Sequence, residues 1–207
     1  MAITRSDPET PLWAPSREHV ARTRMVAFAA YVADLAGRPL TSYTDLHRWS
    51  IDEPAQFWRA VWDFCAIIGT PGERVVVDED VMPGARWFPD ARLNFSENLL
   101  RRTDNERALV FWGEEKVKRT MSRAELRTEV ARFATALRHA GVGVGDRVAA
   151  YMPNMPETIV AMLATASLGA VFTSASPDFG VQGVVDRFGQ TTPKVLIACR
   201  RNSRHRW

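Results

Sequence analysis

The chain is poor in the residues that build disulfide frameworks and metal sites. Its 207 residues include two cysteines, Cys65 and Cys199, and four histidines that are not spaced as ligands. This pattern excludes a disulfide scaffold and predicts no metal site. No run of about 18 apolar residues occurs, as a membrane span requires, and the first residues lack the apolar core of a secretory signal. We therefore expect a cytoplasmic protein that does not enter a membrane.

The chain has no net positive charge outside its C-terminal end. Four arginines in the last eight residues more than account for the net charge of +3. Nucleic-acid binding requires Lys and Arg clustered over a folded face, preferably among stacking aromatics. The distribution predicts a basic tail and no nucleic-acid partner.

Several catalytic signatures are also missing. The sequence contains neither the glycine-rich lysine loop that cradles nucleotide phosphates nor the nucleophile elbow of the hydrolases. Glycines 141, 143 and 145 follow a predicted helix, whereas a dinucleotide-binding loop follows a strand. They therefore indicate a helix stop and a turn, and the residues alone suggest no acid–base pair.

The first hundred residues are predicted to be mainly helical. Residues 16–35 have the period of an amphipathic helix that Ser16 caps and Gly37 ends. A second helix is expected from near Ser50 to Gly69, with Pro54 in its first turn. Residues 84–98 have no clean period and are expected to form a loop.

The second helix is rich in aromatic residues, which leaves two interpretations open. They could form a cofactor box or pack in an ordinary core, and core packing is favoured because Phe and Trp at helical spacing bury large areas. These residues are Phe57, Trp58, Trp62 and Phe64.

The remaining hundred residues alternate between strands and helices. Residues 108–112 and 117–121 predict a β-hairpin, and Ser122 with Glu125 predicts a capping box on a helix that ends at Gly141. Strands are then expected at 147–152, 170–175 and 194–198, separated by helices at 155–168 and around 181–188. Asn154 and Glu157 are expected to cap the first of these helices.

This order predicts an α/β fold, because strands joined through helices form parallel sheets with right-handed crossovers. We expect a helical N-terminal lead, followed by the first part of a large layered domain. Its mostly parallel sheet is expected to be incomplete.

One segment lies where open α/β sheets bind ligands. Residues 173–180 follow a strand and precede a helix. The hydroxyls of Thr173, Ser174 and Ser176, with backbone N–H groups near Gly180, could meet an anionic or hydroxyl-rich ligand. The alternative is that Ser176 or Asp178 simply caps the next helix.

The segment H-A-G-V-G-V-G-D-R-V-A-A-Y-M-P-N-M-P-E-T-I-V-A-M-L-A-T-A-S-L-G-A-V, residues 139–171, resembles the acyl-adenylate-forming superfamily of acyl- and aryl-CoA ligases. Four further segments resemble its acetoacetate–CoA ligases more closely than its acetate–CoA ligases. They are P-L-W-A-P-S, S-I-D-E-P-A-Q-F-W, W-F-P-D-A-R-L-N-F-S-E-N-L-L and S-A-S-P-D-F-G.

The resemblance implies a reaction and its cofactors. ATP, acetoacetate and CoA would give acetoacetyl-CoA, AMP and diphosphate with the help of Mg²⁺, and the substrate is a small-molecule acid. The family's phosphate loop, its ribose-binding acid and the lysine of its C-terminal domain have no counterpart here, so we assign no catalytic residue. Ser176, Pro177 and Asp178 correspond to a Phe-Gly-Gly loop that contacts CoA in the acetate–CoA ligases, and they are the candidate CoA-side residues.

The resemblance also implies a division of the chain. Residues 1–100 would be a helical N-terminal region of the acetyl-CoA-synthetase type, 101–198 the start of the AMP-binding domain, and 199–207 an unmatched basic tail. We hypothesise a frameshift near Cys199, and expect a fragment that is inactive alone. The alternative is a non-catalytic module that binds CoA or complements a separately encoded C-terminal remainder.

Overall fold

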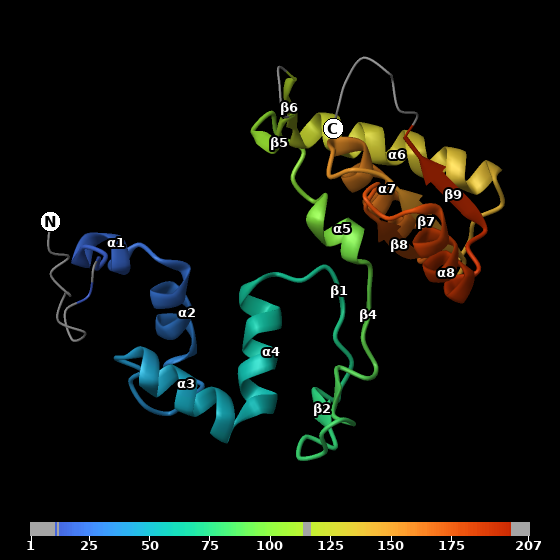
Figure 1. Cartoon of the computed structure of the whole chain (residues 1–207). Helices are drawn as coiled ribbons and strands as arrows, with labels where there is room; N and C mark the ends of the chain where they lie inside the picture. Colours follow the sequence, from blue (N-terminus) through green and yellow to red (C-terminus); the bar gives the residue numbers. More distant parts are fainter. Residues whose placement is uncertain (1–10, 12, 114–116, 200–207) are drawn as a thin grey trace, which may run out of the picture. The chain divides into compact units, whose positions relative to one another are not determined.

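The computed structural model describes residues 11, 13–113 and 117–199 and divides the chain into two compact units, Met1–Arg92 and Leu93–Trp207 (Figure 1). Residues 200–207, most of the predicted basic tail, lie outside the described part. Among the described helices, none combines the length and apolarity needed to cross a bilayer.

Two helices, rather than the predicted one, form the start of the N-terminal unit. They are α1, Arg17–Ala21, and α2, Arg24–Val32. Ser16 caps α1 as predicted, and its hydroxyl accepts a hydrogen bond from the His19 amide at 3.1 Å. The prediction of a continuous helix is wrong because Thr23 adopts an extended conformation and caps α2.

The next helix pair also differs from the prediction. Helix α3 covers Tyr43–Asp52 and α4 covers Pro54–Phe64. Pro54 occupies the first turn of α4 as expected, but the predicted start near Ser50 is wrong because Ser50 belongs to α3. Helix α3, which was not predicted, begins with a capping box between Ser42 and Asp45.

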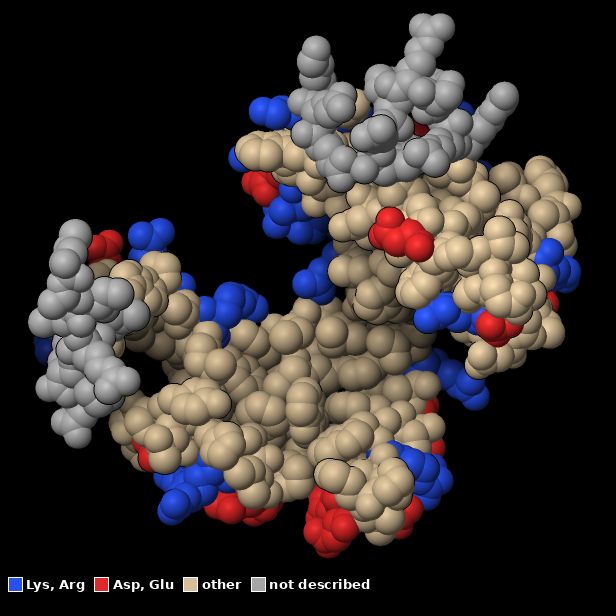
Figure 2. All heavy atoms as spheres, viewed as in Figure 1, with Lys and Arg blue, Asp and Glu red and all other residues tan. Residues whose placement is uncertain are grey.

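Phe57 and Phe64 of α4 pack against the core of this unit, as favoured from the sequence, whereas Trp58 is 42% exposed. Phe57 and Phe64 lie against Phe28 with ring centroids 5.7 and 5.1 Å apart. The buried core is completed by residues of α2, α3 and α4, namely Phe28, Val32, Leu46, Trp49 and Ala60. In the view of Figure 2, the surface around α4 is largely uncharged, with the Lys, Arg, Asp and Glu side chains at its margins.

Short strands follow α4. They are β1, Gly69–Thr70; β2, Val76–Val77; β3, Arg86–Trp87; and β4, Arg92–Leu93. Strands β2 and β3 pair antiparallel. The predicted loop at 84–98 therefore includes β3 and β4, and it ends in a short helix, α5, Phe95–Leu99.

The second unit contains the predicted hairpin and the helix after it. Strands β5, Arg107–Trp112, and β6, Lys118–Ser122, pair antiparallel. Helix α6, Arg123–His139, begins with the predicted capping box of Ser122 and Glu125. Both predictions are confirmed.

The parallel sheet is also confirmed. Strands β7, Arg147–Tyr151; β8, Val171–Ala175; and β9, Val195–Ala198, lie in the order β8-β7-β9 and are all parallel. Helix α7, Pro156–Ser167, joins β7 to β8, and α8, Val181–Thr191, joins β8 to β9. The fold is therefore of the predicted α/β class.

The predicted cap of α7 is wrong. Met155 is the N-cap residue and makes no side-chain cap bond, while Pro156 takes the first position of the helix. Glu157 instead forms an ion pair with Arg119 of β6. The carboxylate therefore links the hairpin to α7.

Two hydrogen bonds to Asp146, together called the Asp146 clamp, fix the edge of the parallel sheet at which β7 and β9 begin. The Asp146 carboxylate accepts hydrogen bonds from the Gly143 amide at 2.8 Å and from Lys194 Nζ at 3.0 Å. These bonds, the Gly143 bond foremost, lower the pKa of Asp146. The clamp joins the turn before β7 to the start of β9. The turn itself begins at Gly141, which follows α6 with a positive φ, as the glycine pattern indicated.

The core of the N-terminal unit gives a first prediction. Trp49 is 2% exposed and Trp13 is 75% exposed. We expect Trp49→Ala to lower the free energy of unfolding by about 3–5 kcal/mol, because it leaves a large cavity. Urea denaturation followed by far-UV circular dichroism measures the loss. Trp13→Ala is the matched control, with an expected change within about 0.5 kcal/mol; equal losses in both variants would contradict the assigned core.

The Asp146 clamp gives a pH-dependent prediction. A carboxyl whose pKa is lowered by folding stabilises the fold above its unfolded pKa of about 3.9, and this contribution is lost as the pH falls through the folded pKa. Asp146→Asn should therefore lower the thermal midpoint at pH 7, and the difference from the unsubstituted chain should shrink below about pH 4.

The control for the clamp is Glu129→Gln, which removes a surface ion pair with Arg132 on α6. Its thermal midpoint should stay near that of the unsubstituted chain at pH 7. An Asp146→Asn deficit that is unchanged at pH 3 would show that the carboxylate charge is not the stabilising feature.

Candidate functional site

The three parallel strands end at one edge of the sheet. Tyr151, the last residue of β7, pairs with Ala175 of β8 and with Ala198 of β9. The segment after each strand therefore starts at the same edge, which is where open α/β sheets collect ligands.

The connections from β7 and β8 leave this edge on opposite faces of the sheet. Val148 and its neighbour Val195 belong to the core cluster that includes α7, whereas Ala149 packs with Phe188 of α8. Because side chains alternate along a strand, α7 and α8 cover opposite faces. Residues 176–180 begin at the C-terminal end of β8, beside that of β7, on the edge of the parallel sheet where ligands bind.

The predicted site residues hydrogen-bond to one another in this loop. The Ser176 hydroxyl donates to the Asp178 carboxylate at 2.7 Å, and the Asp178 amide donates back to the Ser176 oxygen at 3.3 Å. The Phe179 amide donates to the Ser176 carbonyl at 3.1 Å, which closes a turn around Pro177. The loop is thus held by its own residues.

The capping alternative for this loop is wrong. The N-cap residue of α8 is Gly180, and no side chain caps the helix. Ser176 and Asp178 do not cap it because their side chains are bonded to each other. The ligand-binding alternative stays a prediction.

The other predicted hydroxyls do not join Ser176. Thr173 and Ser174 both lie inside β8, where they pair with Ala149 and Ala150. Successive residues of a strand face opposite sides of the sheet, so Thr173 and Ser174 cannot face one ligand together.

Tyr151 is a site residue that the sequence analysis missed. Its hydroxyl oxygen lies 2.8 Å from the carbonyl oxygen of Pro177 and 2.9 Å from that of Phe179. Its ring packs with the buried cluster of Ala149, Ala175 and Phe188. The only sequence signal for it was its position near the end of the strand predicted at 147–152.

A cation lies close to this loop without pairing with its carboxylate. The Arg187 guanidinium lies over the Phe179 ring, 3.9 Å from the centroid, and donates to the Gly183 carbonyl at 3.0 Å. Gly180 adjoins open space, because a Cβ atom built there would have no neighbour within 4 Å. The loop therefore offers backbone groups and free volume rather than a cluster of charged side chains.

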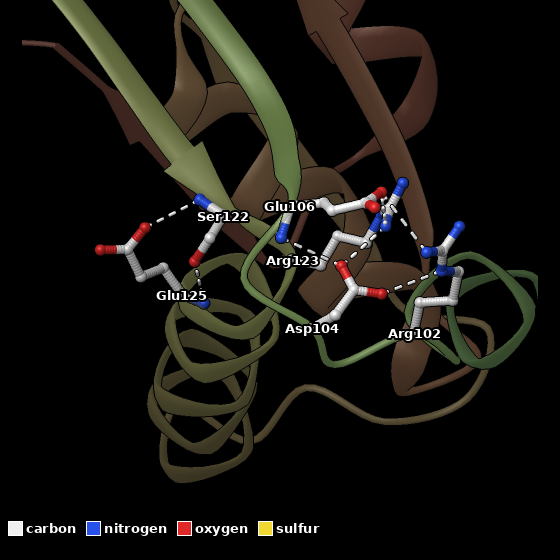
Figure 3. A network of polar contacts seen from close by, with 6 residues as sticks. All are labelled: Arg102, Asp104, Glu106, Ser122, Arg123 and Glu125. Carbon is white, nitrogen blue, oxygen red and sulfur yellow. Dashed lines mark hydrogen bonds and ion pairs between the residues drawn. The ribbon is translucent and has the colours of Figure 1, made fainter.

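A second polar cluster contains two carboxylates, but it is structural. Figure 3 shows Asp104 between Arg102, at 2.9 Å, and Arg123, at 2.7 Å, with Glu106 on the same Arg123 at 2.7 Å. Desolvation raises the pKa of Asp104, but hydrogen bonds from Arg123 and from the Glu106 amide outweigh it and leave the pKa lowered. Carboxylates held as ion-pair partners do not form an acid–base couple; these join the hairpin to α6.

Nucleotide phosphates and Mg²⁺ find no fitting site in the described residues. No group of three His, Cys, Asp or Glu side chains within residues 13–113 and 117–199 is placed to hold a metal ion. The sequence also lacks a phosphate-cradling glycine loop. Of the three cofactors that the resemblance implies, only CoA has candidate residues here.

Comparison with known proteins identifies relatives over nearly the whole chain. A family model described as AMP-binding enzyme matches residues 95–206, and one described as acetyl-coenzyme A synthetase N-terminus matches residues 43–99. Acetoacetyl-coenzyme A synthetase of Rhizobium meliloti (strain 1021) is 54% identical over 92% of this chain, and acetoacetyl-CoA synthetase of Macaca fascicularis is 42% identical over 90%.

A solved structure shows the same fold. Acetoacetyl-CoA synthetase from Streptomyces lividans superposes with a TM-score of 0.84, at 44% identity and over 91% of this chain. The chain spans less than a third of these relatives: 29% of the Rhizobium protein, 28% of the Macaca protein and 30% of the Streptomyces chain.

Proposed function

Because the chain belongs to the AMP-binding enzyme family, we propose that its 207 residues are the N-terminal portion of an AMP-forming acid–CoA ligase. The proposed reaction converts ATP, acetoacetate and CoA into acetoacetyl-CoA, AMP and diphosphate. The observation that carries this proposal is the 54% identity to a protein named acetoacetyl-coenzyme A synthetase, which extends over 92% of the chain.

The reaction has two chemical steps. A carboxylate oxygen of the acid attacks the α-phosphorus of ATP and diphosphate leaves; the CoA thiolate then attacks the acyl carbon and AMP leaves. Stabilising the first step requires donors and cations around the phosphates. We assign no such group among the described residues, so this part of the ligase would contribute to the CoA side and to the scaffold.

The candidate CoA-side residues are Ser176, Pro177 and Asp178. Their loop starts at the carboxyl edge of the parallel sheet, where ligands of α/β sheets bind. The negative charge of Asp178 disfavours the phosphates of CoA, whereas the uncharged pantetheine arm carries amide groups that backbone N–H and C=O groups can bind. We therefore assign the pantetheine arm, rather than the nucleotide end of CoA, to this loop.

The division of the chain follows the same proposal. Residues 1–100 would form the helical N-terminal region of the ligase, and residues 101–198 would begin its AMP-binding domain. The helices α1 to α4 before residue 92 and the parallel sheet after it agree with this order.

A chimera tests the proposed function. Residues 11–198 of this chain would replace the matching segment of the Rhizobium synthetase, and diphosphate release would be measured with acetoacetate, ATP and CoA. We expect the chimera to turn over acetoacetate, whereas the 207-residue polypeptide alone should not, because the family's phosphate loop and lysine are not among its residues. A folded but inactive chimera, or turnover by the chain alone, would contradict the proposal.

The second candidate is a non-catalytic module that complements a separately produced remainder. The observation in its favour is apolar exposure along the outer strands and α8: Val171 is 51% exposed, Leu196 58% and Val185 57%. Uncovered apolar strand residues invite association. Activity that appears when the 207-residue chain is mixed with the remainder of the Rhizobium synthetase would favour this candidate over a covalently continuous enzyme.

The assignment of CoA to the loop predicts the effect of a bulky residue at position 180. Gly180 has φ −64° and open space around its Cβ direction, so Gly180→Leu should leave the fold intact. A leucine in the volume that the pantetheine arm would occupy should weaken CoA binding by about tenfold or more. Calorimetric titration of the 207-residue chain with CoA measures this change.

Gly189→Leu is the matched control for this prediction. Gly189 lies on α8 and also has open space around its Cβ direction, but it is near the opposite end of the helix. Its CoA affinity should equal that of the unsubstituted chain. Equal CoA affinity in Gly180→Leu and Gly189→Leu would remove the loop from the CoA site.

A further inference from the structure

We propose that Tyr151 is a positioning residue that holds the 176–180 loop in the conformation that receives the CoA arm. The inference rests on the proposed function and deepens it, because it names the group that orients the loop. It begins from one contact: a single phenol hydroxyl reaches two carbonyl oxygens, at 2.8 Å on Pro177 and 2.9 Å on Phe179.

The hydroxyl has one proton, so the two carbonyls share it in a three-centre hydrogen bond. Both carbonyls are therefore drawn toward Tyr151, and neither is aimed at the open side of the loop. The ring of Tyr151 is anchored by the apolar cluster around Ala149 and Phe188, so the hydroxyl is a fixed point for the loop.

The orientation of the Phe179 carbonyl determines the direction of the next amide. In a trans peptide the C=O and the following N–H point in opposite directions. With the Phe179 carbonyl directed at Tyr151, the Gly180 N–H is directed away from Tyr151. Among the described residues it has no hydrogen-bond acceptor, and the Cβ direction of Gly180 is open.

The local hydrogen bonds of the loop do not replace this contact. Ser176 and Asp178 bond to each other, and the Phe179 amide bonds to Ser176, so these bonds close the turn without connecting it to the sheet. Tyr151, the last residue of β7, connects the turn to the sheet through carbonyl groups that lie 26 and 28 residues later in the chain. Removing the hydroxyl would leave the turn closed but free to rotate against the strand.

Tyr151→Phe tests this inference, because it removes the hydroxyl and keeps the ring. Hydrogen exchange of the 207-residue chain should be faster at residues 178–181 and unchanged in β7 and α7. In the Rhizobium chimera, the KM for CoA should rise about threefold to tenfold, the factor that corresponds to one hydrogen bond. The kcat and the KM for ATP should stay within about twofold, which a general loss of structure would not allow.

The control is Tyr43→Phe, which removes the hydroxyl of a tyrosine that is 70% exposed in the N-terminal unit. Unchanged exchange at 178–181 in Tyr151→Phe would overturn the inference. An equal rise in the KM for ATP and in the KM for CoA would show that Tyr151 has only a general structural role, and would contradict the inference. Failure of the unsubstituted chimera to turn over would instead contradict the proposed function, and the exchange result would still decide whether Tyr151 holds the loop.

Discussion

Burial of β7 on both faces is the constraint on which the second unit depends. Val148, Ala149 and Ala150 are all 0% exposed, and no single helix can cover both faces of a strand. Helix α7 covers one face and α8 the other. The chain must therefore leave β7 and β8 towards opposite faces of the sheet, and both connections start at the carboxyl edge at which the candidate site lies. The site follows from the way the central strand is buried.

The same constraint explains the outer strands. A three-stranded sheet fully surrounds only its middle strand, and the side chains of Val171 on β8 and Leu196 on β9 stay more than half exposed. The relatives are about three times as long as this chain and offer many residues that could cover these strands. These apolar side chains could be covered by a covalent continuation of the chain or by a separate polypeptide. The chimera and the mixing experiment distinguish the two.

Local signals predicted the elements whose determinants lie within a few residues. The capping box of Ser122 and Glu125 and the positive-φ Gly141 fixed both ends of α6, and apolar runs gave the strands. Contacts distant in sequence decided the failures. Glu157 looked like a cap but pairs with Arg119, 38 residues earlier. The break at Thr23 was missed because a threonine can cap a helix or lie within one. Tyr151 was missed because its partners are backbone carbonyls, which carry no sequence signal.

The importance of backbone groups also bears on how a site can be kept while its side chains change. Ser176 and Asp178 satisfy each other, so what the loop has left to offer a ligand is its main chain and the open space at Gly180. If the pantetheine arm is bound by that main chain, as we propose, the residues at 176–178 can differ from the Phe-Gly-Gly of the acetate–CoA ligases without loss of the ligand. The residue that must be kept for CoA binding would then be the one that orients the main chain of the loop. Tyr151 meets this requirement, because its partly buried ring packs against the cluster of Ala149, Ala175 and Phe188 at the end of the most buried described strand.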